Sequence, residues 1–199
     1  EFIGTFAFAL SGIRLAATKH YDWLGGFVCG VAVAIGGGTI RDVMLGQTPF
    51  WMSSPIYLLF TLLAQLVVIV CHHYLKRLDN TWFLFDTLGL ALFNIAGIQK
   101  TLDCGFPFWV AIIMGCITGS FGGVIRDVLL NEEPVIFRKE IYAMACVIGG
   151  LVYWGFSCLD VSLYVTVVAS FVTVCAIRLL AVKYHISLPT LRDEEEKDN

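Results

Sequence analysis

The chain has 199 residues, of which 58% are hydrophobic and 15% charged, and its mean hydropathy is +0.79. A soluble domain usually has about 45–50% apolar and about 25% charged residues, and one water-soluble core of this size cannot bury so much apolar surface. The net charge of -3 and the pI of about 5.8 exclude the basic surface that binds nucleic acid. The composition therefore predicts a membrane protein that is neither a soluble enzyme nor a nucleic-acid-binding protein.

Seven apolar segments follow one another along the chain, and none shows the alternation of a barrel wall. They cover about 2–17, 23–45, 56–74, 82–98, 106–130, 141–156 and 161–182. Because a spanning helix needs about 20 apolar residues, we predict an all-α membrane protein with seven transmembrane helices. They form a single domain, residues 1–189, which lies in the lipid bilayer. The charged segment at 190–199 is expected to be a cytoplasmic tail.

Lys and Arg residues in the short loops indicate the orientation of these helices. The loops after the first, third and fifth segments and the C-terminal flank together carry Lys19, Lys76, Arg77, Arg138, Lys139 and Lys183. The opposite loops carry only Lys100, whose long side chain we expect to reach the membrane surface. Since short cytoplasmic loops are rich in Lys and Arg, the C-terminus is expected in the cytoplasm and the N-terminus outside.

The first and second parts of the chain match when one is shifted by 85 residues. The comparison begins with Glu1 on Asp86 and covers 57 pairs, of which 15 are identical. The longest match places Ile40–Val43 on Ile125–Val128. Each copy holds three predicted helices, so the second copy is inverted in the membrane. We predict two inverted three-helix repeats, about 1–75 and about 82–157, plus a seventh helix at about 161–183. In such architectures broken helices at the repeat interface supply the binding site.

Glycines interrupt the second and fifth segments at Gly36, Gly37, Gly38, Gly119, Gly122 and Gly123. One interpretation is close helix packing, because small residues let two backbones approach each other. The other is a kink or an unwound turn, since glycine tolerates unusual backbone conformations. The released carbonyls would then line a wet cavity and bind alkali cations, with the Thr39 hydroxyl as a further ligand. Because both copies contain the glycines, we favour the kink or unwound turn.

Two pairs of adjacent charged residues lie in the same segments, namely Arg41–Asp42 and Arg126–Asp127. An arginine at the centre of a membrane helix costs about 2.5–3.5 kcal/mol unless it reaches the interface. Adjacent residues diverge by about 100° around a helix, so each arginine is expected to find its partner on another helix or at a helix C-terminus. Asp86, the shift mate of Glu1, is a candidate partner, and the alternative places it at the membrane interface. The expected roles of these charges are gating, or tethering the broken helices.

Motifs of enzymes, cofactor sites and metal sites are missing from the sequence. It contains no GxSxG, HExxH or GxxxxGK[ST] pattern. The adjacent His72 and His73 lie in a predicted loop and are interpreted as interfacial residues. We therefore expect no enzymatic activity, no cofactor and no bound metal apart from a permeant K⁺ or Na⁺ ion.

The doubled glycine motif at 36–43 and 122–128 resembles that of the trimeric intracellular cation channel (TRIC) superfamily, and more closely that of its bacterial branch. The resemblance extends from about 2 to 189. It implies a homotrimer in a bacterial inner membrane, with one pore per subunit for small monovalent cations, mainly K⁺, between the glycine-kinked second and fifth helices. The Lys-Glu-Val tripeptide that animal members use for lipid binding is absent, so lipid regulation is not implied.

Three hypotheses for the function follow, and a K⁺ channel is the leading one. The second is a secondary transporter of glycine or another small amino acid, because bacterial members are also associated with glycine transport and inverted repeats suit alternating access. The third is a membrane scaffold whose glycines only pack helices together, which predicts a dry interior.

Overall fold

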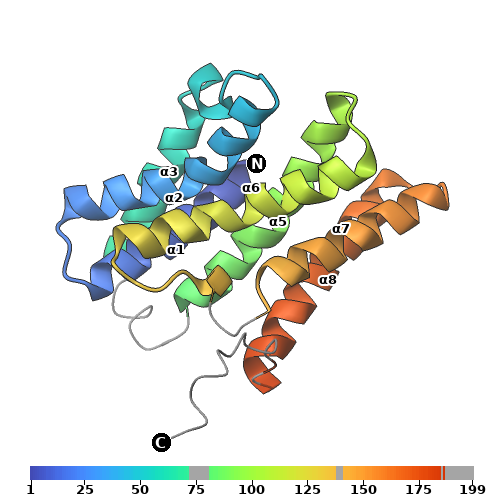
Figure 1. Ribbon diagram of the computed structural model, residues 1–199. Helices are drawn as coiled ribbons and strands as arrows, with labels where there is room; N and C mark the ends of the chain where they lie inside the picture. Colours follow the sequence, from blue (N-terminus) through green and yellow to red (C-terminus); the bar gives the residue numbers. More distant parts are fainter. Residues whose placement is uncertain (72–80, 138–140, 185, 187–199) are drawn as a thin grey trace, which may run out of the picture.

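The computed structural model describes residues 1–71, 81–137, 141–184 and 186, and within these it contains seven α-helices and no strand (Figure 1). The helices are α1 (Phe2–Thr18), α2 (Trp23–Met44), α3 (Ile56–Val70), α5 (Thr81–Asp103), α6 (Phe108–Leu129), α7 (Ala143–Cys158) and α8 (Leu163–Tyr184). Short 3-10 helices, η1 (Phe50–Ser53) and η2 (Val135–Phe137), follow α2 and α6. The predicted all-α fold is confirmed.

The helices differ in length. α2, α5, α6 and α8 are long and apolar enough to cross a membrane, whereas α1, α3 and α7 are apolar helices of 15–17 residues. The fourth segment was predicted too short, because α5 continues past Ile98 to Asp103. Its last turns keep a buried side, on which the Thr101 hydroxyl donates to the Gly97 carbonyl at 2.7 Å. Residues 72–74, with His72 and His73, and the predicted tail at 190–199 lie outside the described residues.

Residues related by the 85-residue shift meet across the interfaces between the two copies. The rings of Phe8 in α1 and Phe93 in α5 stack with their centroids 5.3 Å apart. Likewise, α2 packs directly against α6, its counterpart in the second copy. The predicted inverted repeat is therefore visible in the packing, and its pseudo-two-fold axis passes between α1 and α5 and between α2 and α6.

The ends of α2 and α6 repeat the same backbone geometry. A residue with positive φ follows the C-cap of each helix, namely Gly46 (φ 68°) after α2 and Asn131 (φ 53°) after α6. The next amide then donates to a carbonyl of the last turn, at 2.8 Å from Gln47 to Asp42 and at 2.8 Å from Glu132 to Asp127. This Schellman geometry satisfies carbonyls that the helix itself leaves open. It brings η1 and η2 back toward the Asp side chains.

The seventh predicted helix, α8, stands outside the two repeats. It packs on α7 and α5, and Figure 1 shows α7 and α8 on the opposite side of the molecule from α3. The buried residues of α8 include Ser170, Val174 and Arg178. The Ser170 hydroxyl donates to the Gly149 carbonyl of α7 at 2.9 Å. α8 thus covers the second copy and brings one buried charge with it.

Candidate functional site

The predicted hinge glycines lie inside uninterrupted helices. α2 is helical through Gly36, Gly37 and Gly38, and α6 is helical through Gly119, Gly122 and Gly123. The expected unwound turn is therefore wrong for this structure. Helical backbone hydrogen bonds continue through both segments, so no released carbonyl requires a wet cavity here.

Close approach of α2 and α6 explains why glycine occupies two of these positions. A Cβ at Gly37 would collide with the carbonyl oxygen of Thr118 on α6. In the mirrored contact, a Cβ at Gly122 would lie 2.7 Å from the carbonyl oxygen of Val33 on α2. Val33 and Thr118 are themselves related by the 85-residue shift. The packing interpretation of these glycines thus accounts for the observed contact, and the two helices seal the space between them.

The remaining candidate glycines also face neighbouring atoms. An added Cβ would meet the Ile125 side chain at Gly36, the Phe50 ring at Gly38, the Leu90 carbonyl at Gly119 and the Tyr142 hydroxyl at Gly123. The nearby Thr39 hydroxyl donates to the Ile35 carbonyl at 2.7 Å and accepts from the Trp51 indole at 3.0 Å. In this conformation Thr39 is engaged by the protein itself rather than offered to an ion.

A first cluster of buried charges surrounds Arg41 in the last turn of α2. The Arg41 guanidinium is fully buried and pairs with Glu1 at 2.9 Å and with Asp42 at 2.7 Å. The same Asp42 oxygen receives the Lys100 ammonium of α5 at 2.8 Å. The other oxygen of Asp42 accepts from the Phe50 amide of η1 at 2.7 Å. The first cluster therefore joins two cations and two carboxylates from three parts of the chain.

A second cluster surrounds Arg126 in the last turn of α6. The fully buried guanidinium pairs with Asp86 of α5 and, at 2.8 Å, with Asp127. It also donates to the Ser11 hydroxyl of α1 at 2.8 Å. The second oxygen of Asp127 accepts from the Val135 amide of η2 at 2.9 Å. Burial of these ionised groups is tolerated because each has an oppositely charged partner and further hydrogen bonds.

Residues related by the 85-residue shift make the same contacts in the two clusters. Glu1 and Asp86, which the sequence identified as shift mates, each pair with the arginine of their own copy. Each also accepts a hydrogen bond at 3.3 Å from a tyrosine hydroxyl, Tyr57 for Glu1 and Tyr142 for Asp86. Asp86 is fully buried and pairs with Arg126, which is the partner that the sequence interpretation offered for it. The predicted candidates Arg41, Asp42, Asp86, Arg126 and Asp127 fall into these two clusters.

One expectation about these charges is only partly right. Each arginine does reach a carboxylate outside its own helix, but it also bonds to the aspartate beside it, at 2.7 Å for Arg41 and Asp42. The long arginine side chain curls back to its neighbour. The Asp42 carboxylate is held in reach by the amide of η1. The angle between adjacent helix positions therefore does not decide which groups pair at a helix end.

Sequence reasoning missed the roles of two basic residues. Lys100 was expected to reach the membrane surface, but its ammonium pairs with Asp42, and its side chain is 30% exposed. Arg178 of α8 is fully buried, and its guanidinium lies over the rings of Tyr142 at 4.6 Å and Phe83 at 4.8 Å. An arginine inside an apolar run is itself a signal of a buried polar site, and this signal could have identified Arg178.

A cavity gives the first cluster contact with the surroundings. It has a volume of about 370 Å³, and Glu1, Gln99, Lys100 and Asp103 are among its lining residues. Lys100 therefore connects this cavity to the buried Asp42. The second cluster is enclosed, because Asp86 and Arg126 are fully buried. The charged groups thus lie near both ends of the α2–α6 crossing, and one of the two sets adjoins an open cavity.

A family model described as "Glycine transporter" matches residues 1–73 and 83–157. The chain belongs to this family. Among curated relatives, the UPF0126 inner membrane protein YadS of Escherichia coli is 41% identical over 98% of this chain and 96% of the relative. A UPF0126 membrane protein of Vibrio cholerae is 39% identical over 96% of this chain and 80% of the relative. Both relatives are named as membrane proteins, as predicted for this chain.

Solved structures connect this glycine transporter family member to the TRIC channels. The TRIC trimeric intracellular cation channel orthologue from Rhodobacter sphaeroides has a TM-score of 0.88 and 31% identity, over 93% of this chain and 96% of that one. A structure reported for conductance through TRIC cation channels has a TM-score of 0.85 and 35% identity, over 97% and 96% of the two chains. The predicted resemblance to the TRIC superfamily is confirmed. These solved structures are ion channels, which supports the prediction that this chain is not an enzyme.

Proposed function

We propose that the protein is a cation channel of a bacterial inner membrane, with a separate path beside the α2–α6 crossing of each subunit. The observation that supports this most is the pair of buried charge clusters at the two ends of the crossing. Ionised groups inside membrane segments are costly, and they commonly mark ion pathways. The likeness to cation channel structures agrees with this assignment.

The packing of α2 on α6 represents a closed state in this proposal. Gly37 and Gly122 seal the crossing against opposing carbonyls, so conduction requires the two helices to separate or bend there. The carbonyl oxygens of Thr118 and Val33 would then face the gap and replace part of an ion's water shell, as carbonyl oxygens do in K⁺-selective pores. Arg41 or Arg126 must also withdraw, because an unpaired positive charge in a narrow path repels cations.

K⁺ is the proposed main permeant ion, and three copies of the chain are the proposed assembly. Both points rest on the resemblance to the TRIC superfamily, and one of the similar solved structures is described as a trimeric channel. Cross-linking of the purified protein should yield a trimer as its largest discrete product. A dominant dimer or monomer contradicts the trimer.

Single-channel recording tests the channel proposal. Pure protein in planar bilayers should give reproducible unitary K⁺ currents, and K⁺-loaded proteoliposomes should release K⁺ faster than protein-free liposomes. The exposed Lys19–Glu132 pair, which is 2.5 Å long, offers a control, since Lys19→Gln should leave the currents unchanged. Absence of unitary currents in preparations that retain the trimer contradicts the proposal.

The second candidate function is secondary transport of glycine. The description of the matching family model favours it, and inverted repeats suit alternating access. The same proteoliposomes distinguish the two functions. A transporter should give saturable uptake of radiolabelled glycine without unitary current steps, whereas a channel should give current steps without saturable uptake.

A further inference from the structure

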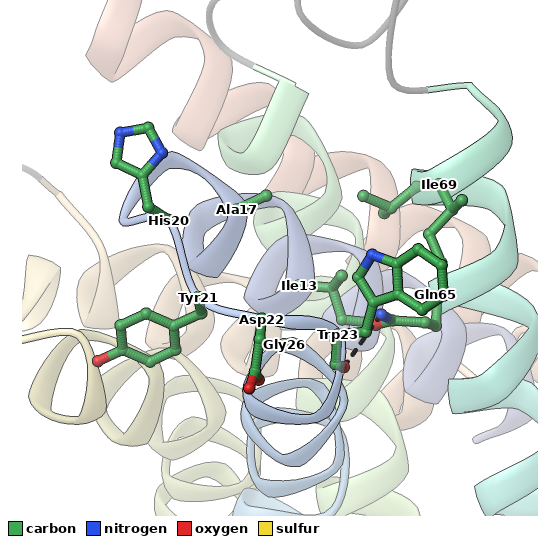
Figure 2. Close-up of a pocket in the computed structure, with 10 residues that line it drawn as sticks. Ile13, Ala17, His20, Tyr21, Asp22, Trp23, Gly26, Gln65 and Ile69 are labelled. Atoms are coloured by element: carbon green, nitrogen blue, oxygen red, sulfur yellow. Dashed lines mark hydrogen bonds between the residues drawn. The ribbon is translucent and has the colours of Figure 1, made fainter.

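A cavity of about 460 Å³ lies between the end of α1, the start of α2 and the last turns of α3. Figure 2 shows its lining, in which Gln65 of α3 is joined to Trp23 by a hydrogen bond while the Tyr21 side chain turns away. The Tyr21 hydroxyl donates instead to the Leu129 carbonyl of α6 at 3.1 Å. The cavity is thus at the same end of the molecule as the end of α6, and none of its described lining residues belongs to either charge cluster.

Gln65 places an unused acceptor at this cavity. The residue is only 9% exposed, and its Nε2 donates to the Trp23 carbonyl at 3.2 Å. This bond fixes the orientation of the amide group. The Oε1 atom is buried and has no hydrogen-bond partner among the described residues. Since a buried acceptor without a donor is unfavourable, the arrangement suits a ligand that brings an N–H or O–H group.

The second copy carries different residues at the positions that line this cavity. The 85-residue shift places Ala17 on Leu102, Gly26 on Ala111, Val68 on Tyr153 and Gln65 on Gly150. In the second copy, the larger side chains pack into one hydrophobic cluster that includes Ile98, Ala111 and Tyr153. Three of these four positions therefore carry smaller residues in the first copy, and the Gln65 amide has no counterpart at Gly150 in the second.

The charges around the cavity favour a cation. None of the ten described lining residues is Lys or Arg, and Asp22 contributes a carboxylate. That carboxylate accepts from the Gly25 amide at 2.6 Å. It therefore caps the N-terminus of α2, which would otherwise attract an anion. The Trp23 indole, 76% exposed, adds an aromatic face of the kind that binds cations.

We propose that this cavity binds a primary ammonium group. Gln65 Oε1 accepts one of its N–H donors, and the Asp22 carboxylate supplies negative charge nearby. The apolar side chains of Ile13 and Ile69 hold the attached carbon chain. Two sources share this chemistry: the headgroup of phosphatidylethanolamine and a small free amine such as ethanolamine.

Amines with and without N–H donors test the proposal. Delipidated full chain in detergent is titrated with phosphatidylethanolamine or phosphatidylcholine of the same acyl chains, and separately with ethanolamine or choline, while its unfolding temperature is followed. The three methyl groups of choline leave no donor for Gln65, so binding should be at least about tenfold weaker for the choline forms. A response to the lipid alone identifies the headgroup as the source, and a response to ethanolamine shows that free amines enter. Equal responses to both forms, or no response, overturns the proposal.

Two variants separate binding from folding. Gln65→Met keeps the length of the side chain but removes the acceptor, and it should weaken ethanolamine-form binding at least about tenfold. Val68→Tyr copies Tyr153 of the second copy, fills the cavity and should abolish the response. Gln99→Met, in the cavity beside the first cluster, is the matched control and should respond as the wild type does. A folded Gln65→Met or Val68→Tyr protein with wild-type binding overturns the assignment.

Discussion

Asp42 and Asp127 each pair with an arginine and also accept a hydrogen bond from a backbone amide. Asp127 balances the buried charge of Arg126 and also accepts the amide of Val135, which fixes the turn into η2. Asp42 does the same for Arg41 and the Phe50 amide of η1. Each arginine is therefore connected to the shape of a helix end. If the arginines withdraw as proposed above, each movement must be accompanied by a change in the turn that its neighbouring aspartate holds.

Substitution of Arg126 by methionine should strongly destabilise the protein. Arg126→Met leaves Asp86 and Asp127 buried without their cation, and breaking a buried pair costs about 3–5 kcal/mol. Denaturant unfolding in mixed micelles measures this loss. The double variant Asp86→Asn with Arg126→Met should recover part of it, because one of the two uncompensated charges is then removed.

The control for this prediction is an exposed ion pair. Lys19 and Glu132 have side chains that are 40% and 35% exposed, and exposed pairs contribute about 0–1 kcal/mol. Lys19→Met should therefore have little effect on unfolding. If Arg126→Met costs no more than Lys19→Met, the buried charges are not the stabilising feature described above.

The sequence predicted the members of the clusters better than their contacts. Arg126 and Asp86 stood out because charges are rare in apolar segments, and the 85-residue shift related Asp86 to Glu1. The bond between Arg126 and Asp127 depends on the side-chain conformations that the η2 turn imposes. Such conformations are set by tertiary packing and leave no local pattern in the sequence.

At the scale of whole helices, the α2–α6 crossing shows why glycine patterns are ambiguous. A glycine that bends a helix and a glycine that admits a neighbouring backbone look the same in a sequence. The distance to the opposing helix decides between them. At Gly37 and Gly122 that distance leaves no room for a Cβ, so packing alone already explains both residues in this conformation. A bend during opening remains part of the proposal for function.

Alanine at either glycine of the crossing should separate α2 from α6. In Gly37→Ala and Gly122→Ala the new methyl group meets a backbone carbonyl of the other helix, which cannot rotate away as a side chain can. We expect each variant to lose about 1–3 kcal/mol of stability, as is typical of overpacking. The added Cβ lies closer to the opposing carbonyl oxygen at Gly37 than at Gly122, so the larger loss is expected for Gly37→Ala. Thermal unfolding of the purified variants measures them.

Gly155 in α7 provides a matched control for these variants. A Cβ there meets nothing within 4 Å among the described residues, and alanine is favoured over glycine in a helix by about 1 kcal/mol. Gly155→Ala should therefore leave stability unchanged or raise it. Equal losses at Gly155 and Gly37 would show that the contact between α2 and α6 is not what makes Gly37 sensitive, because Gly155 has no such contact.

For the molecule as a whole, the two copies have the same arrangement of helices, but only one of their charge clusters adjoins an open cavity. The first cluster includes Lys100 and adjoins an open cavity, whereas the corresponding position in the other copy is Leu15. The second cluster is enclosed and is covered by α8, with Arg178 over Tyr142. The 85-residue shift in the sequence could predict the shared arrangement of helices and charged residues. The differences arise from single substitutions between copies, so the ends of the proposed path are chemically distinct.

The orientation in the membrane determines which end faces the cytoplasm. The distribution of Lys and Arg predicts that the turn after α7, with the exposed Cys158, lies outside the cell, and that Cys71 at the end of α3 lies inside. Two proteins that each retain a single cysteine, Cys158 or Cys71, can be treated with a membrane-impermeant maleimide in intact cells. Cys158 should be labelled directly, and Cys71 only after permeabilisation. The opposite pattern would invert the molecule and place the cavity beside Gln65 at the outer surface.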